Sequence, residues 1–265
     1  DALPAALAIE YFHNFSLIHD DMMDNAPIRR GKTTIHEKYG PNTAVLSGDV
    51  LLVYAYKFLT KVPEENLKLV YEIFSDTAIE VCEGQQLDMN FETQSNVTEE
   101  EYIWMIRLKT SVVLAAGLQI GAIIGGATKE DGEALYQYAL NLGLAFQIQD
   151  DILDCYGKAE LVGKQIGGDI IQNKKTILLI RALEACKQAN DSTLENILNL
   201  KDQDPQEKIQ LVLDKYLQYQ ILDSVEKTQQ VYIQKAQEYL EATSLPLKNK
   251  ESLYELIEYL IKREY

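Results

Sequence analysis

Proline and glycine are distributed along this chain in a way that only a helical protein tolerates. Prolines stand at positions 4, 27, 41, 63, 205 and 246, so residues 64–204 contain none, and glycine is absent after Gly168. Helix interiors exclude proline and penalise glycine, whereas a β-rich chain needs turn residues at short intervals. The sequence therefore predicts an all-α fold built from long helices.

The spacing of apolar residues supports the same fold class. Apolar side chains recur every three or four residues in two segments, which is the stripe of an amphipathic helix. Thr98 followed by Glu101 predicts a capping box at a helix start. No long linker or repeat divides the chain, so we expect one domain over residues 1–265. The apolar stripes are Leu69, Ile73 and Phe74, and Ile209, Val212, Leu213, Tyr216 and Leu217.

Composition excludes several classes of protein. With 46% hydrophobic residues the chain can bury a core, and its 25 basic against 41 acidic residues give a net charge of −16. Such acidity argues against a nucleic-acid partner, because phosphates repel it. The longest uncharged apolar stretch, Ser111–Thr128, contains four glycines and falls short of the about 20 strongly apolar residues that span a bilayer. No basic, apolar leader begins the sequence. We therefore expect no transmembrane segment and a cytoplasmic location.

Two short aspartate clusters, Asp20–Asp24 and Asp150–Asp154, share the pattern Asp-Asp-x-x-Asp. On a helix, the first and last aspartate of such a cluster lie one turn apart, about 40° around the axis. Both clusters follow apolar stretches, where a solvated face is not expected. Because neighbouring carboxylates repel one another, a cation is expected to neutralise each group.

The chemistry of the clusters indicates the cation. Carboxylate oxygens without cysteines or a histidine pair favour Mg²⁺ or Mn²⁺, and magnesium completes its coordination with water and substrate phosphate. A single cluster would be a weak signal. Two clusters of one spacing fit two walls of a cavity that are bridged by a metal-bound diphosphate.

Basic residues gather near the clusters in this acidic chain. Arg29–Lys32 follows the first cluster, Lys109 precedes the apolar glycine-containing stretch, and Lys164 and Lys174 follow the second cluster. Local positive charge in these places suits a polyanion such as diphosphate.

These motifs resemble the trans-isoprenyl diphosphate synthases, the family of farnesyl and geranylgeranyl diphosphate synthases. They occur in the family's order and cover residues 12–175 densely, whereas the C-terminal part matches only in helical character. The matching segments are Phe12–Asp24, Arg29–Gly31, Gly84–Asp88, Lys109–Thr110, Phe146–Asp154 and Gly163–Lys174.

The resemblance implies a bundle of long antiparallel helices around a deep central cavity, the isoprenoid synthase fold, and a homodimer. It also implies a reaction. An allylic diphosphate loses pyrophosphate with Mg²⁺ assistance, isopentenyl diphosphate attacks the carbocation, and a proton is lost. Metal ions would stabilise the leaving group, while an apolar cavity keeps water from the cation.

By the same resemblance, the direct Mg²⁺ ligands are expected to be Asp20, Asp24 and Asp150. The remaining cluster members are expected to act nearby or through water; these are Asp21, Asp151 and Asp154. Together with Lys109 and Lys164, all six form the expected catalytic set.

The resemblance also implies substrate contacts. The allylic diphosphate is expected to contact Arg29, Lys109, Gln147, Lys164 and Lys174, with Thr110 beside its hydrocarbon. Isopentenyl diphosphate is expected to contact His13 and Arg30. Gln85 and Asp88 are expected to support the site, with Asp88 positioning a basic group.

One departure concerns the start of the chain. Family members carry a Gly-Gly-Lys-Arg-like segment well before the first cluster, where it completes the isopentenyl diphosphate site. The sequence begins at Asp1, too close to Asp20 to include this segment. We therefore expect the domain to lack its N-terminal helices here.

Product length is expected to depend on the helical turns before Asp20. Ser16 and Phe12 lie one and two turns below it, and Phe15 lies at the position where a bulky residue limits chain growth in the family. An ideal helix places Phe15 about 140° from Asp20, so geometry alone favours Phe12. Following the family, we expect a C20 product, with C15 next and longer products least expected.

Two other readings share this fold. Terpene cyclases keep one aspartate cluster but replace the second with an Asn/Ser/Glu pattern, which Asp150–Asp154 does not show. A noncatalytic partner subunit of an active synthase tends to lose aspartates, and both clusters here are complete. A purely structural helical protein would leave the basic residues unexplained.

Overall fold

The computed structural model describes residues 2–157, 167–200 and 204–261. Short segments connect most of its helices and strands. They are α1 (Leu3–Met23), β1 (Ile28–Arg29), β2 (Lys32–Thr33), α2 (Ile35–Tyr39), α3 (Pro41–Leu59), α4 (Glu64–Thr93), α5 (Glu99–Ile106), the π-helix η1 (Arg107–Ser111), α6 (Val112–Ile124), α7 (Lys129–Tyr156), α9 (Gly168–Ile171), α10 (Ile177–Gln188), α11 (Thr193–Asn199), α12 (Pro205–Gln218), α13 (Ile221–Ala242) and α14 (Leu247–Ile261).

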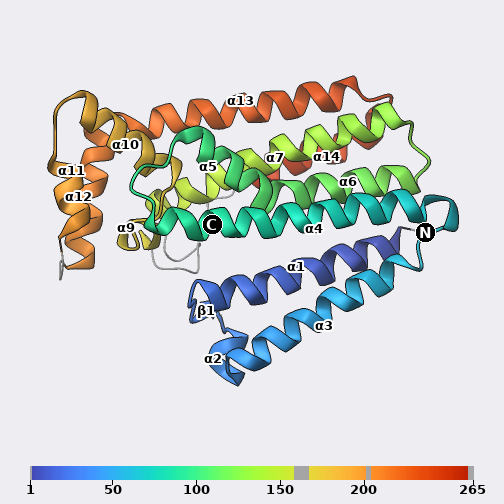
Figure 1. Cartoon of the computed structure of the whole chain (residues 1–265). Helices are drawn as coiled ribbons and strands as arrows, with labels where there is room; N and C mark the ends of the chain where they lie inside the picture. Colours follow the sequence, from blue (N-terminus) through green and yellow to red (C-terminus); the bar gives the residue numbers. More distant parts are fainter. Residues whose placement is uncertain (1, 158–166, 201–203, 262–265) are drawn as a thin grey trace.

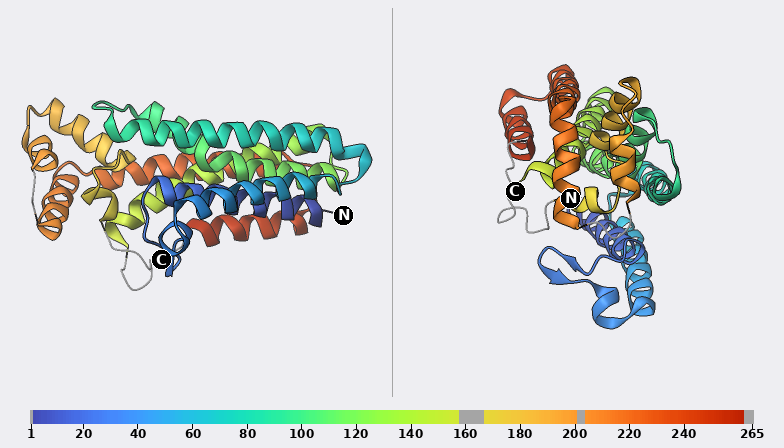
Figure 2. Two further views of the ribbon diagram at one scale, coloured as in Figure 1. Left: turned by 60° about the horizontal axis from the view of Figure 1, so that its bottom comes forward. Right: turned by 90° about the vertical axis from the view of Figure 1, so that its left-hand side faces the viewer.

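The long helices form a bundle that runs along one axis (Figure 1). Helices α1, α3, α4, α7 and α13 run along this axis, the shorter α6 covers part of its length, and α10–α12 gather at one end (Figures 1 and 2). In the described ranges, strands are confined to the two-residue pair β1 and β2. The prediction of an all-α fold is confirmed.

Side-chain caps explain several of the helix starts. Thr98 accepts a hydrogen bond from the Glu101 backbone N–H at 3.2 Å, and the Glu101 side chain accepts one from the Thr98 N–H at 2.8 Å. Thr128 caps α7 in the same way through the N–H of Asp131. Such caps satisfy backbone donors that have no partner inside the helix. The predicted capping box is therefore present.

Two apolar clusters form the core. One joins α1, α4, α6, α7 and α13, and the other joins the end of α7 to α10–α13. Tyr232 packs against both clusters, so the two cores are continuous. Two residues of the predicted stripes lie outside the core, since Leu69 is 48% exposed and Leu217 is 78% exposed. Each predicted stripe therefore includes one residue that is exposed to solvent.

The stretch Glu99–Ile124 is long and apolar enough to cross a membrane by length and composition alone. It comprises α5, η1 and α6. In the bundle these elements pack against α4 and α7, so burial in a protein core is a sufficient reason for their composition.

The backbone of η1 lies unusually close to its two neighbours. A Cβ atom on Gly84 of α4 would stand 2.3 Å from the backbone N of Lys109, and one on Gly143 of α7 would stand 2.9 Å from Ser111. Only glycine permits these approaches. The Ser111 hydroxyl donates to the carbonyl of Ile106, five residues earlier. The π-helix is therefore held between two glycines, which fixes the origin of the Lys109 side chain.

Candidate active site

The first aspartate cluster ends α1 and meets a basic hairpin. Strands β1 and β2 are joined by Arg30 and Gly31, whose φ angles of 52° and 73° give the twisted two-residue turn that hairpins favour. The hairpin places Arg29 beside the cluster. Its Nε donates to Asp21 Oδ1 at 2.6 Å and its Nη2 to Asp20 Oδ2 at 3.0 Å. One guanidinium thus bridges two carboxylates.

Lys109 reaches the same cluster from η1. Its Nζ lies 3.0 Å from Asp20 Oδ1 and donates to Asp88 Oδ2 of α4 at 2.6 Å. Burial alone would lower the pKa of Lys109, but the charges of Asp20 and Asp88 outweigh it and raise the pKa. The basic group that Asp88 contacts is therefore Lys109, which stays charged between two carboxylates.

Lys174 connects the two clusters electrostatically. It follows α9, near the end of the bundle where α1 and α7 finish (Figure 1). Burial alone would lower the pKa of its ammonium group. The pKa is nevertheless raised, because four carboxylates act on it: Asp88, Asp169, Asp151 and Asp24. Since these include a member of each cluster, both clusters contribute to one site.

The second cluster ends α7 and is held by donors from other segments. Tyr102 of α5 donates its hydroxyl to Asp151 Oδ2 at 2.6 Å, and the Asp169 N–H donates to Asp154 Oδ2 at 3.0 Å. Burial, with the nearby charge of Asp169, raises the pKa of Asp151 above its usual range. Asp150 is the solvent-exposed member of the cluster.

Negative charge is incompletely neutralised at the first cluster. Desolvation and the charge of Asp20 raise the pKa of Asp24 to about 6. Oδ1 of Asp20 is buried, and the group that faces it is the Lys109 ammonium, 3.0 Å away. A hard divalent cation would satisfy both carboxylates, so the donor set fits Mg²⁺ or Mn²⁺.

The carboxylates are arranged around lysine and arginine. In the ranges that the structure describes, no group of three or more His, Cys, Asp or Glu side chains has the geometry of a metal site. The reason is visible in the contacts of the first cluster, whose oxygens face Arg29 and Lys109. Asp20 must exchange one of these contacts before it can bind a metal ion.

Gln85 adds an orphaned donor. Its side-chain Nε2 is buried without a hydrogen-bond partner among the described residues. The residue lies on α4, one turn before Asp88. An unpaired buried donor is costly, and an anionic ligand would satisfy it. This observation agrees with the expected supporting role of Gln85 at the site.

The remaining predicted substrate residues occupy different places. Thr110 is half-buried in η1, and Gln147 is half-buried on α7, one turn before Asp151. His13 lies on α1, where burial lowers its pKa and the charges of both hairpin arginines act on it. Arg30 is exposed at the turn. Lys164 lies outside the described residues.

The residues expected to set product length point in different directions. Phe12 is buried, with its ring centroid 5.4 Å from that of Phe74 on α4. Phe15 stacks on His19, which contacts the Val45 carbonyl of α3. Ser16 bonds back to the carbonyl of His13. Phe12 therefore faces α4, while Phe15 packs between Phe12, at a centroid distance of 5.6 Å, and His19.

Sequence reasoning missed three residues that hold the site together. Tyr102 and Asp169 contact the second cluster, and Gly143 admits the π-helix. Asp169 stands in a matching motif and could have been found there. Tyr102 lies on a different helix, so no local spacing reveals its contact. A glycine within an apolar run, such as Gly143, indicates close packing, but the sequence does not show that the neighbour is Ser111.

The bundle and the two carboxylate clusters with lysines between them define an all-helical protein of the isoprenoid synthase fold. The sequence comparison agrees, because the family model for polyprenyl synthetase matches residues 1–216. The chain belongs to the polyprenyl synthetase family. This is the family that its motifs resemble.

Two relatives illustrate the range of the family. A geranylgeranyl diphosphate synthase of Methanosarcina mazei is 38% identical over 99% of this chain and 79% of its own length. A geranylfarnesyl diphosphate synthase of Natronomonas pharaonis is 44% identical over 69% of this chain and 54% of its own length. The chain thus spans about four fifths of the first relative and about half of the second.

Solved structures show the same fold. A crystal structure of a geranylgeranyl pyrophosphate synthase superposes with a TM-score of 0.94 at 40% identity, covering 100% of this chain and 82% of the other. A polyprenyl synthase from Caulobacter crescentus, complexed with calcium and isoprenyl diphosphate, gives a TM-score of 0.85 at 29% identity, covering 99% and 78%.

Proposed function

We propose that this chain is a prenyltransferase that condenses isopentenyl diphosphate head-to-tail with an allylic diphosphate, giving a short-chain all-trans prenyl diphosphate. The observation that carries the proposal is the charge arrangement between the clusters. Lys109 contacts Asp20, and Lys174 interacts with Asp24 and Asp151. Cations between two acidic walls are what a metal-bound diphosphate requires.

The divalent cation is proposed to be Mg²⁺ or Mn²⁺, held by Asp20, Asp24 and Asp150. When bound, it would neutralise charge on the departing pyrophosphate. The protein's own contribution is to position cations for the same anion. Lys109, which Asp88 holds in place, would be able to turn its ammonium group from Asp20 to the diphosphate if Asp20 held a divalent cation.

The function is tested by incubating the full chain with Mg²⁺, isopentenyl diphosphate and each allylic primer in turn. We expect a prenyl diphosphate to form and product formation to stop when the metal is chelated. If no primer gives product, the chain is a partner subunit of another synthase and the proposal is wrong.

The proposed main product has twenty carbons. The Methanosarcina relative carries the name of a C20 synthase, and bulky Phe15 with small Ser16 before the first cluster supports this length. The Natronomonas relative carries the name of a C25 synthase, so C25 is a further candidate length.

Replacing Phe15 by alanine is expected to lengthen the main product by at least one five-carbon unit. Removing the ring opens space beside Phe12, which it touches at a centroid distance of 5.6 Å. Chromatography of the dephosphorylated products measures the change. Phe58→Ala on α3 is the control, because it removes an equally large, half-buried ring whose neighbour on α1 is Tyr11, at a centroid distance of 5.0 Å, rather than Phe12. If Phe15→Ala and the wild type give the same length, Phe15 does not limit chain growth.

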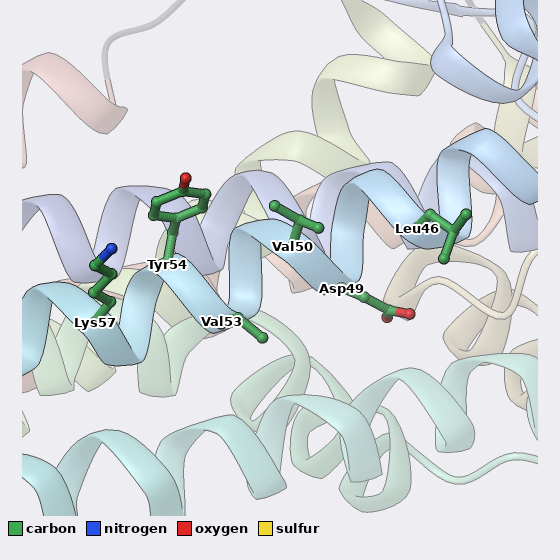
Figure 3. Close-up of a pocket in the computed structure, with 6 residues that line it drawn as sticks. All are labelled: Leu46, Asp49, Val50, Val53, Tyr54 and Lys57. Carbon is green, nitrogen blue, oxygen red and sulfur yellow. The ribbon is translucent and has the colours of Figure 1, made fainter.

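We further propose that the protein is a homodimer that pairs through α3. Apolar side chains emerge from this helix along a surface groove (Figure 3). The exposed set includes Leu46, Val50, Val53 and Tyr54. A continuous exposed apolar stripe favours a protein partner over water, and the homodimer that the family resemblance implies would cover it.

Replacing Val50 by aspartate is expected to convert the dimer to monomer, because two copies of the buried charge would face each other across a twofold interface. Light scattering after size-exclusion chromatography measures the mass. Val231→Asp on α13 is the matched control, since Val231 is 50% exposed and Val50 is 52% exposed. If both variants keep the mass of the wild type, α3 is not the interface.

We propose a cytoplasmic location and a single isoprenoid synthase domain. The continuity of the two core clusters through Tyr232 supports one domain. Fractionation of cells that express the full protein would test the location.

A further inference from the structure

Tyr102 is buried next to the second aspartate cluster but belongs to a different helix. It is 2% exposed, and its hydroxyl donates to Asp151 Oδ2 at 2.6 Å. The same oxygen accepts a longer hydrogen bond of 3.4 Å from the N–H of Ile177, at the start of α10. The short contact from α5 is therefore the main restraint on this carboxylate.

Helix α5 is itself firmly fixed. Arg181 of α10 donates to both carboxylate oxygens of Glu99, at 2.8 and 2.6 Å, and also to Thr228 Oγ1 of α13 at 2.6 Å. A bidentate arginine pair sets orientation as well as distance. The capping box at Thr98 adds a further restraint at the same turn. Tyr102 thus stands on a helix that is tied to α10 and α13.

We propose that Tyr102 is a positioning residue for the second aspartate cluster. Its hydroxyl holds Asp151 toward α5, so that the exposed Asp150, about 100° away on α7, faces the diphosphate site. The proposal rests on the function proposed above.

The alternative orientations of Asp151 explain why a restraint matters. A carboxylate chooses among a few staggered rotamers, and Lys174 is the nearby cation that acts on it. Without the Tyr102 hydroxyl, Asp151 would turn toward Lys174. That movement would engage the lysine, which we expect to hold the diphosphate, and would place a second carboxylate beside Asp150.

The test compares Tyr102→Phe with Tyr138→Phe. Tyr138 is equally buried, and its hydroxyl also makes one hydrogen bond, to the Leu253 carbonyl at 2.8 Å. Both changes remove one hydroxyl, so the two melting temperatures should fall alike. Only Tyr102→Phe should lower kcat and weaken Mn²⁺ binding, each by about tenfold, as outer contacts of metal sites typically do. The KM for isopentenyl diphosphate should stay unchanged.

Mn²⁺ binding is measured by electron paramagnetic resonance in the presence of inorganic pyrophosphate, without turnover. This measurement separates the two proposals. If the wild type makes no product but Tyr102→Phe still binds Mn²⁺ more weakly than the wild type, only the proposed function is contradicted. Equal kcat and Mn²⁺ affinity in the two tyrosine variants would overturn the positioning role.

A double variant tests whether Tyr102 acts through Asp151. The single variant Asp151→Asn and the double variant, which carries Tyr102→Phe as well, should have the same kcat. In both, the carboxylate that the Tyr102 hydroxyl would orient is gone. If the two losses multiply instead, Tyr102 acts by another route and the proposal is wrong.

Discussion

Replacing Asp20 by asparagine is expected to lower kcat by about 10³-fold, because the loss of about 4 kcal/mol of charge stabilisation corresponds to three factors of ten. Asp20 has the largest set of contacts in the first cluster. It lies 3.0 Å from both Lys109 Nζ and Arg29 Nη2. The amide removes a metal ligand and places an NH₂ group next to two cations. Steady-state kinetics with saturating Mg²⁺ and both substrates measures the loss.

The control for this variant is Asp76→Asn on α4, where the carboxylate is exposed and remote from both clusters. Circular dichroism should show the same helical content for both variants and the wild type. Turnover by Asp20→Asn within about tenfold of the wild type would contradict the two-cluster mechanism.

The fold could be predicted because residues close in sequence determine where many of its helices begin and end. Thr98, Thr128 and Pro205 mark starts that the structure contains. The break between α12 and α13 carries no such mark, because Gln220 takes a left-handed φ of 51° without glycine or proline. Tertiary packing rather than propensity decides that turn.

The site was predictable to the extent that its residues lie in short motifs. The spacing of the aspartates and the family resemblance assigned the aspartates and Lys109 to one site, but they could not show that Arg29 and Lys109 already occupy the oxygens of Asp20. That arrangement depends on a hairpin turn and on a π-helix. Neither has a strong local signal, because an Arg-Gly turn is uncommon and a π-helix differs from an α-helix by one residue.

Replacing Gly84 by alanine is expected to lower kcat by about 10²-fold, although the residue touches no substrate. The added Cβ would lie 2.3 Å from the backbone N of Lys109 and 2.7 Å from the carbonyl carbon of Leu108. Because these are backbone atoms, no side-chain rotation relieves the clash, and η1 must move away from α4. A shift of about 1 Å in a positioned group costs about this much in rate.

The change should also reverse the usual sign of a glycine-to-alanine substitution in a helix. Alanine normally stabilises a helix interior by about 0.5–1 kcal/mol, and Gly132→Ala on α7, where no atom lies within 4 Å of the new Cβ, should follow that rule. Gly84→Ala should instead lower the free energy of unfolding by about 1–3 kcal/mol through overpacking.

Urea denaturation of both variants, together with kcat per folded molecule, tests the two expectations. A Gly84→Ala protein that is as stable and active as Gly132→Ala would mean that η1 yields without moving Lys109. The position of Lys109 would then have to depend on its contacts with Asp88 and Asp20.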